Sequence, residues 1–319
     1  MSGNQPLHWL GGFIADLPTP FDDDDHIDWH AFEALCEHQI RSGATAIVVG
    51  ETMGEASTLG RDEHEEIISA AASIAGGRIA VIAGAGSNST SQAMELTTAA
   101  EAAGADAVLS VVPYYNKPMQ TGIVAHFQAI AGSTGLPIIL HDVPARTMRE
   151  MSDDSIVELS QSRQFIGLKD ASGSMARLFR LKSELPPAFR LLSGDDATAM
   201  AYLASGGDGC ISIVANLFPD LCHGFRESCA NHMPVSANLA GRIAALGALL
   251  SADSSVPALK FGMGMLGFMK PAVRLPLVEL GADARKAVAL AMTAVGEDDQ
   301  SMSCERARNQ IPWTATRAR

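Results

Sequence analysis

The chain alternates short, strongly apolar β-type runs with amphipathic helical stretches along most of its 319 residues. Several runs are continuously apolar, which is typical of parallel strands covered on both faces. The expected strands are Phe13–Leu17, Thr45–Val49, Ile79–Ala83, Ala107–Val112, Pro137–Leu140, Phe165–Leu168, Arg190–Leu192 and Gly209–Val214. Eight strands alternating with helices predict an α/β fold, the (β/α)₈ TIM barrel, although the strand count alone leaves an open doubly wound sheet as an alternative.

The segments between the runs carry helix signals. Asp62–Ala75 places acids in its first turn, where they interact favourably with the helix dipole, and Ser87–Ala105 begins with capping residues. Further helical patterns follow the eighth run as a C-terminal extension. We expect the barrel over residues 1–216, a C-terminal helical region over 217–297 and a flexible, polar tail over 298–319.

Composition narrows the classes of function. The formal net charge of −13 argues against partners such as nucleic acid or an anionic membrane surface, because both require a basic surface. No apolar stretch reaches the length of about 18 residues that spans a membrane, and the start of the chain has no signal-like pattern. The five cysteines lack metal-type spacing, so we expect free thiols, no metal site and a cytoplasmic protein.

A single lysine ends the sixth apolar run. Lys169 directly follows Phe165–Leu168, and polar and small residues come next. In a parallel barrel the catalytic groups lie where strands end, and an ammonium beside a packed interior loses solvation, which lowers its pKa and frees the amine to attack a carbonyl. An ion pair with Asp170, or a side chain that extends to solvent, is the structural alternative.

Other strand ends carry groups that suit the same chemistry. The loop Gly50–Glu55 places glycines around a hydroxyl and can hold a carboxylate with backbone N–H groups. Tyr114 and Tyr115 follow the fourth run, where a phenol can relay protons. His141 would titrate near neutral pH, and Arg146 can bind a carboxylate in a forked geometry. Together these groups favour imine chemistry on a keto acid.

From Gly12 to Asn216 the chain resembles a known family, the class I pyruvate aldolases of dihydrodipicolinate synthase and N-acetylneuraminate lyase type. The resemblance is closest to the synthase branch and thins in the C-terminal helices. The segments that carry it are "GLKDASG", "VVPYYNKPMQTG", "ETMGEASTL", "VPART", "LSGDDAT" and "GCISIVAN".

The resemblance implies roles for individual residues. Lys169 would form the imine with pyruvate, and Thr52 would be the relay threonine of the loop that binds the pyruvate carboxylate. Tyr115 would be a relay tyrosine contributed by a neighbouring subunit, which implies a homotetramer. Gly194 and Ile211 stand at positions that contact substrate or imine.

The resemblance also implies the reaction. Arg146 stands where the synthases bind the carboxylate of aspartate semialdehyde, and the neuraminate lyases lack this arginine. The implied reaction condenses pyruvate with aspartate semialdehyde to 4-hydroxy-tetrahydrodipicolinate. No metal or organic cofactor is expected, because the lysine imine itself serves as the electron sink.

Two residues depart from the family pattern inside the site. His141 stands where the family has a proton-relay tyrosine, and it could serve as general acid and base with a different pH profile, or mark a different second substrate or a lost activity. Met53 stands in the substrate-binding loop in place of a second threonine, which removes a hydroxyl from that loop.

The feedback site for lysine also departs from the pattern of lysine-sensitive members. Gln92 replaces a glutamate and Arg61 replaces a histidine, while His64, Asn88 and Tyr114 match. Losing a carboxylate and gaining a cation weakens the binding of cationic lysine, so we expect little feedback inhibition.

Two alternative functions remain open from the sequence. The first keeps the imine and changes the substrate, as in a hydratase-aldolase, a keto-sugar-acid aldolase or dehydratase, or a hydroxypyrroline-carboxylate deaminase. The second is a non-catalytic barrel that binds a keto acid. Met53 and His141 favour the first alternative, whereas Arg146 argues against it.

Overall fold

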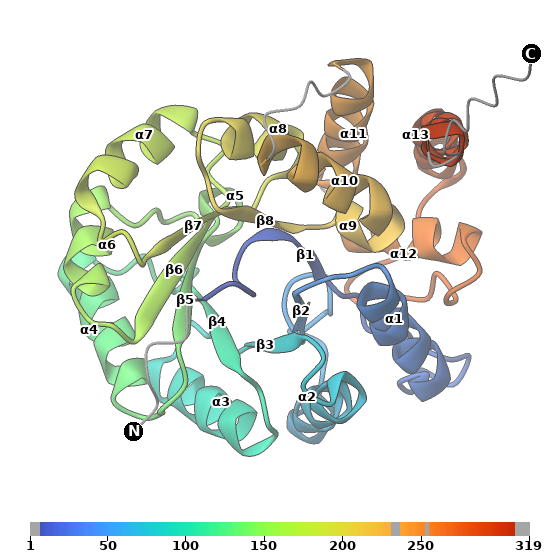
Figure 1. The fold of residues 1–319 in the computed structure, drawn as a ribbon. Helices are drawn as coiled ribbons and strands as arrows, with labels where there is room; N and C mark the ends of the chain where they lie inside the picture. Colours follow the sequence, from blue (N-terminus) through green and yellow to red (C-terminus); the bar gives the residue numbers. More distant parts are fainter. Residues whose placement is uncertain (1–6, 231–236, 253–254, 310–319) are drawn as a thin grey trace, which may run out of the picture.

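The computed structural model describes residues 7–230, 237–252 and 255–309 and shows a closed barrel of parallel strands with helices around it (Figure 1). The strands are β1 (Gly12–Asp16), β2 (Ala46–Val49), β3 (Ala80–Gly84), β4 (Ala107–Val111), β5 (Ile138–Asp142), β6 (Phe165–Asp170), β7 (Arg190–Ser193) and β8 (Gly209–Ser212). They follow one another in chain order, and β8 pairs with β1. The predicted (β/α)₈ barrel is confirmed, and closure of the sheet excludes the open alternative.

Helices surround the barrel and continue after its last strand (Figure 1). Those between strands are α1 (Trp29–Arg41), α2 (Arg61–Ala75), α3 (Thr90–Ala102), α4 (Gln120–Ala131), α5 (Pro144–Thr147), α6 (Asp153–Ser160), α7 (Met175–Glu184) and α8 (Asp196–Ala204). Those after β8 are α9 (Val214–Leu217), α10 (Pro219–Ala230), α11 (Ala237–Leu250), α12 (Ser255–Met265) and α13 (Ala282–Asn309). Helix α13 crosses residue 298, where the sequence analysis placed the start of the tail, and residues 310–319 lie outside the described residues.

β5 and β6 each run two residues further than the sequence indicated. β5 and β6 continue to Asp142 and Asp170, because the parallel ladder still pairs these two residues after it has paired His141 with Lys169. Side chains alternate between the two faces of a strand, so the basic residue and the acid that follows it point to opposite sides. His141 and Lys169 are therefore strand residues side by side at the end of the barrel.

The apolar core has two layers, as the barrel architecture requires. The inner layer fills the barrel with branched side chains, including Ile14, Ile139 and Ile211. The outer layer packs the other strand face against the helices and is much larger. This explains why the strand sequences read as continuous apolar runs, since both faces of each strand are buried.

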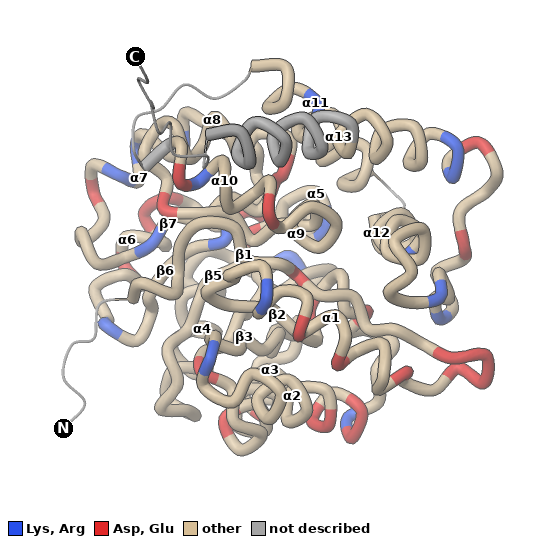
Figure 2. Tube along the Cα trace, turned by 45° about the vertical axis from the view of Figure 1, so that its right-hand side comes forward, with Lys and Arg blue, Asp and Glu red and all other residues tan. Residues whose placement is uncertain are grey.

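Most charged residues in the described ranges lie on the surface, and the buried exceptions include Asp16, Glu51 and Lys169. Figure 2 shows Lys and Arg scattered along the trace and Asp and Glu both around α1, α2 and α3 and near α7 and α10, in line with the net charge of −13. No helix in the described ranges is both long enough and apolar enough to cross a membrane.

Candidate active site

The amine of Lys169 lies between two buried carboxyl groups. Lys169 is only 5% exposed, and its Nζ is 3.1 Å from Oδ2 of Asp16 at the end of β1 and 3.5 Å from Oε2 of Glu51 after β2. The structural alternative of an ion pair with Asp170 is wrong, because Asp170 points to the other face of β6 and pairs with Arg177. Lys169 therefore points into the barrel mouth, where three strand ends converge.

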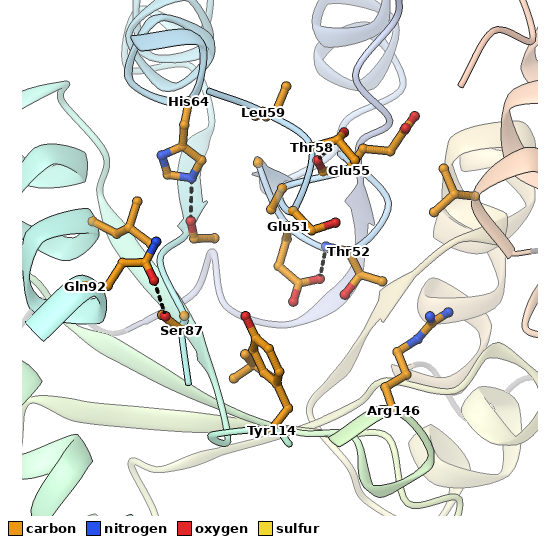
Figure 3. A pocket seen from close by; sticks show the side chains of 18 of the residues that line it. Glu51, Thr52, Glu55, Thr58, Leu59, His64, Ser87, Gln92, Tyr114 and Arg146 are labelled. Carbon is orange, nitrogen blue, oxygen red and sulfur yellow. Dashed lines mark hydrogen bonds between the residues drawn. The ribbon is translucent and has the colours of Figure 1, made fainter. Parts of the chain in front are cut away.

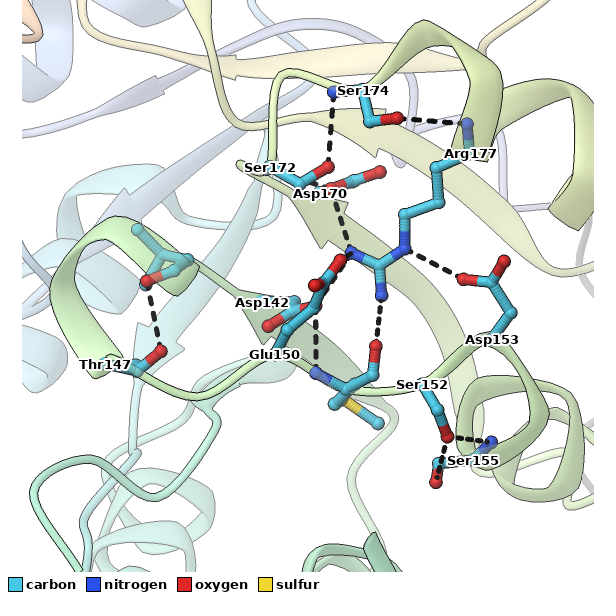
Figure 4. Close-up of polar contacts among 12 residues, drawn as sticks. Asp142, Thr147, Glu150, Ser152, Asp153, Ser155, Asp170, Ser172, Ser174 and Arg177 are labelled. Atoms are coloured by element: carbon cyan, nitrogen blue, oxygen red, sulfur yellow. Dashed lines mark hydrogen bonds and ion pairs between the residues drawn. The ribbon is translucent and has the colours of Figure 1, made fainter. Parts of the chain in front are cut away.

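Asp170 instead belongs to a polar cluster outside the barrel (Figure 4). The guanidinium of Arg177 on α7 is 2.7 Å from Asp142 and 3.3 Å from Asp170, and it also bonds Asp153 at 3.1 Å. Because Asp142 and Asp170 directly follow the two basic residues of the site, Arg177 joins the ends of β5 and β6. It thereby positions His141 and Lys169 on the opposite face.

His141 is the third member of the group around the amine. It is 2% exposed, and its Nδ1 lies 2.9 Å from Oε1 of Glu51. Burial, reinforced by the charge of Lys169, lowers the pKa of His141, although Glu51 opposes this shift. The expectation that this imidazole titrates near neutral pH is therefore wrong, because desolvation of the charged form outweighs its carboxylate partner.

Glu51 connects the members of this group. Its carboxylate contacts Nδ1 of His141 and Nζ of Lys169, and it also accepts a hydrogen bond of 2.5 Å from the backbone N–H of Thr52. Burial opposes ionisation, but Lys169 and His141 hold the pKa of the Glu51 carboxyl well below its ordinary value. Glu51 is thus a charged carboxylate at the centre of what we name the lysine cluster, made of Asp16, Glu51, His141 and Lys169.

Asp16 and Glu51 shift the pKa of Lys169 in the direction opposite to the one expected from the sequence. Burial by itself lowers the pKa of Lys169, but Glu51 and Asp16 outweigh burial and raise that pKa above its ordinary value. Burial raises the pKa of Asp16 to about 7, with Lys169 opposing and Glu51 reinforcing the rise. The lysine at rest is therefore an ammonium, and the cluster must take a proton from it before it can act as a nucleophile.

Asp16 and Glu51 are not among the site residues predicted from the sequence. Asp16 interrupts an apolar run at the end of a strand, which is the same signal that singled out Lys169. Glu51 follows directly after Gly50 in the loop that was interpreted as a carboxylate-binding segment. Each signal was present, but only closure of the barrel shows that both acids contact the lysine.

A cavity of about 640 Å³ opens next to the lysine cluster (Figure 3). Its walls come from the segments that follow β2, β3, β4 and β5, together with α12. Thr52, Tyr114 and Arg146 line it, and Nη2 of Arg146 donates a 2.6 Å hydrogen bond to Oγ of Ser255. The cavity thus holds a hydroxyl, a phenol and a guanidinium beside the cluster, which suits an anionic, oxygen-rich substrate.

The remaining predicted site residues have different surroundings. Gly194 packs against Lys169, because a Cβ on it would lie 3.1 Å from the lysine Cγ, and Ile211 belongs to the inner core layer below. Tyr115 is 90% exposed and has a φ of 69°, and it is not part of the cavity wall. The side chain of Met53 is 3% exposed and packs in the outer core, so a substrate contact from Met53 would have to come from its backbone. The roles of these residues remain predictions.

Comparisons with known proteins agree with this architecture. The model of the dihydrodipicolinate synthetase family matches residues 9–295. A 4-hydroxy-tetrahydrodipicolinate synthase from Rhodopseudomonas palustris is 40% identical over 90% of this chain and 96% of its own length. The same name is carried by a relative from Laribacter hongkongensis that is 39% identical over 89% of this chain and 98% of its own length.

Solved structures give the same result. The chloride-inhibited dihydrodipicolinate synthase from Acinetobacter baumannii, complexed with pyruvate, superposes with a TM-score of 0.86 at 38% identity, covering 90% of this chain and 99% of that one. The enzyme from Cyanidioschyzon merolae with lysine bound superposes with a TM-score of 0.85 at 35% identity, covering 91% and 99%. The chain therefore belongs to the dihydrodipicolinate synthetase family and is a lyase of the class I aldolase type, which confirms the resemblance found in its sequence.

Proposed function

We propose that this protein condenses pyruvate with aspartate semialdehyde to 4-hydroxy-tetrahydrodipicolinate. The observation that carries the proposal is the buried amine of Lys169 at the end of β6, surrounded by three groups that can exchange protons. The names of the relatives from Rhodopseudomonas palustris and Laribacter hongkongensis support the same reaction.

The steps follow from the chemistry of an amine and a keto acid. The neutral amine of Lys169 attacks the keto carbon of pyruvate, and loss of water gives a protonated imine. Removal of a methyl proton yields an enamine, whose carbon attacks the aldehyde of aspartate semialdehyde. The amino group of the adduct then attacks the imine carbon, which closes the ring and releases Lys169.

The surrounding residues have distinct parts in this scheme. Thr52 holds the pyruvate carboxylate through its backbone N–H and takes part in proton transfer with Tyr115. His141 is neutral at rest, so it can accept a proton as the amine is activated. Arg146 lines the cavity and binds the carboxylate of the aldehyde substrate.

The first test separates imine formation from the whole reaction. Borohydride reduction in the presence of pyruvate should add mass to the peptide that carries Lys169. Lys260 is an internal control, because it is also buried and burial lowers its pKa to about 8, yet it pairs with Glu55 and is not part of the lysine cluster. An adduct on Lys260, or none on Lys169, would contradict the proposal.

The second test addresses the aldehyde substrate. Turnover of pyruvate and aspartate semialdehyde is followed by coupling the product to its reductase. Arg146→Ala should raise KM for aspartate semialdehyde by about 10- to 100-fold, the effect of losing a hydrogen-bonded charge, while pyruvate trapping stays intact. No turnover by protein that still traps pyruvate would rule out aspartate semialdehyde as the substrate.

A second candidate function rests on the acids beside the amine. Asp16, neutral below about pH 7, can donate a proton to a departing hydroxyl, as a dehydratase or aldolase acting on another keto acid requires. Turnover of hydroxylated keto acids that exceeds turnover of aspartate semialdehyde would favour this candidate.

We also propose that the protein is a cytoplasmic homotetramer. Support for the assembly comes from Tyr115, whose exposed side chain outside the cavity wall suits a residue that serves a neighbouring subunit. Support for the location comes from the buried free thiols of Cys36, Cys210 and Cys222, which accord with a reducing compartment. Light scattering of the purified protein measures the assembly directly.

A further inference from the structure

Glu51 lies between the cavity and the reactive amine. The cavity wall includes Glu51 and Thr52, but neither Lys169 nor His141 is among the residues that line it. Figure 3 shows the side chain of Glu51 beside the cavity, with its carboxylate on the backbone N–H of Thr52. A carbonyl compound that enters the cavity therefore meets the Glu51 carboxylate before it reaches Nζ of Lys169.

The Glu51 carboxylate accepts the hydrogen bond of the Thr52 backbone N–H, the donor that the proposed function assigns to the substrate carboxylate. Thr52 N–H donates to Oε2 of Glu51 at 2.5 Å, and this oxygen is also 3.5 Å from Nζ of Lys169. A keto acid that forms an imine at Nζ has its own carboxylate one bond from the reacting carbon. Two carboxylates so close together in a buried site repel each other strongly, because little water screens them.

We propose that Glu51 determines the selectivity of this site: its carboxylate occupies the subsite for the keto acid carboxylate, and imine formation requires that it move away. This inference rests on the proposed function, because it assumes that a keto acid binds at Thr52. Glu51 therefore weakens the binding of keto acids relative to neutral carbonyl compounds of the same size.

Displacement of Glu51 also affects the amine. The contacts that Glu51 gives up include the one to Lys169, whose pKa it helps to raise. The open cavity beside Glu51 offers space into which a flexible glutamate side chain can rotate. Displacement of Glu51 thus favours transfer of a proton from the ammonium to neutral His141, so the amine becomes nucleophilic when substrate is present.

The experiment compares two carbonyl compounds in the same trapping assay. Borohydride trapping at Lys169 is titrated with pyruvate and with hydroxyacetone, which replaces the carboxylate by a neutral hydroxymethyl group. In Glu51→Ala the half-saturating pyruvate concentration should fall by about tenfold or more, because a competing charge is removed, and that of hydroxyacetone should change much less. Glu51→Gln, which keeps the size and loses the charge, should fall between wild type and Glu51→Ala.

Glu95→Gln is the matched control. Glu95 lines the outer cavity with a side chain that is 64% exposed, so its neutralisation should leave both titrations unchanged. A pyruvate titration that is unchanged or weaker in Glu51→Ala would overturn the inference, and so would an equal gain for both compounds. Folded Glu51→Ala and Glu51→Gln proteins that no longer trap pyruvate would make Glu51 a catalytic residue instead.

The outcome also separates this inference from the proposed function. If wild type and Glu51→Ala both fail to trap pyruvate, the proposed function and the inference fall together. If wild type traps pyruvate with no dependence on Glu51, only the inference falls. If trapping responds as expected but aspartate semialdehyde is not turned over, the inference stands and only the second substrate is wrong.

Discussion

At the scale of single residues, the lysine cluster sets the protonation of the site. Asp16 is buried, and among the described residues its Oδ1 has no hydrogen-bond partner. A carboxyl in that position gains from being neutral, and its pKa is accordingly raised to about 7 by burial. His141 has a lowered pKa and stays neutral in the same pH range.

These directions predict which group controls the pH dependence of pyruvate binding. Below about pH 7 Asp16 is protonated and neutral, whereas above it Asp16 carries a negative charge 3.1 Å from the amine. The half-saturating pyruvate concentration in the trapping assay should therefore rise as the pH rises through about 7. Asp16→Asn, which stays neutral, should remove the rise, and His141→Gln should keep it. A rise that persists in Asp16→Asn would show that another group titrates.

At the level of helices and strands, the ends of β5 and β6 are held in place by Arg177 on α7. Arg177 is 1% exposed and holds the acids that follow His141 and Lys169, as well as the carbonyl of Met151. Its neighbour Arg180 on the same helix is 64% exposed and contacts only the edge of this cluster, at Asp153. One guanidinium is therefore structural, and the other is a surface group.

Removing the buried guanidinium of Arg177 should lower the free energy of unfolding far more than removing the exposed guanidinium of Arg180. Arg177→Ala leaves Asp142 and Asp170 buried without their cation, and we expect a loss of about 3–5 kcal/mol in the free energy of unfolding. Arg180→Ala should cost no more than about 1 kcal/mol, as exposed ion pairs do. Urea denaturation of both variants and wild type measures the difference. Equal losses would mean that Arg177 does not hold the strand ends together.

At the scale of the whole molecule, the proposed assembly completes the site. Tyr115 is exposed in the single chain, and the resemblance assigns it to the site of a neighbouring subunit. Subunits carrying Tyr115→Phe and Lys169→Ala are each expected to be nearly inactive alone. Mixed oligomers of the two should regain activity, because the lysine of one subunit meets the tyrosine of the other. Mixed oligomers that form, as mass spectrometry can show, but stay inactive would contradict a shared site.

The positions that correspond to the lysine feedback site of lysine-sensitive family members give a second prediction at this scale. Oε1 of Gln92 accepts a hydrogen bond from Oγ of Ser87. The guanidinium of Arg61 pairs with Glu65 at 3.0 Å and lies 3.9 Å from Glu95. Gln92 is uncharged and Arg61 adds a positive charge, so we expect millimolar lysine to leave turnover almost unchanged. The double variant Arg61→His, Gln92→Glu should gain inhibition. Strong inhibition of wild type would refute the prediction.

The amino-acid sequence was enough to predict the barrel and to single out Lys169 as the candidate nucleophile. Continuous apolar runs alternating with helical patterns indicate strands covered on both faces, and local motifs around Lys169 and Arg146 carry the family. The strand ends were placed too early at β5 and β6, because Asp142 and Asp170 are polar and read as loop residues until Arg177 is known to neutralise them.

The chemistry around the amine depends on contacts that form only when the chain is folded. Asp16 is 153 residues from Lys169 along the chain, and Glu51 is 90 residues from His141, so no local pattern links them. Closure of the barrel brings their strand ends together in a space with little water, where charge interactions are strong. That proximity raises the pKa of Lys169, because the electrostatic shift depends on the distance between the charges and on their burial.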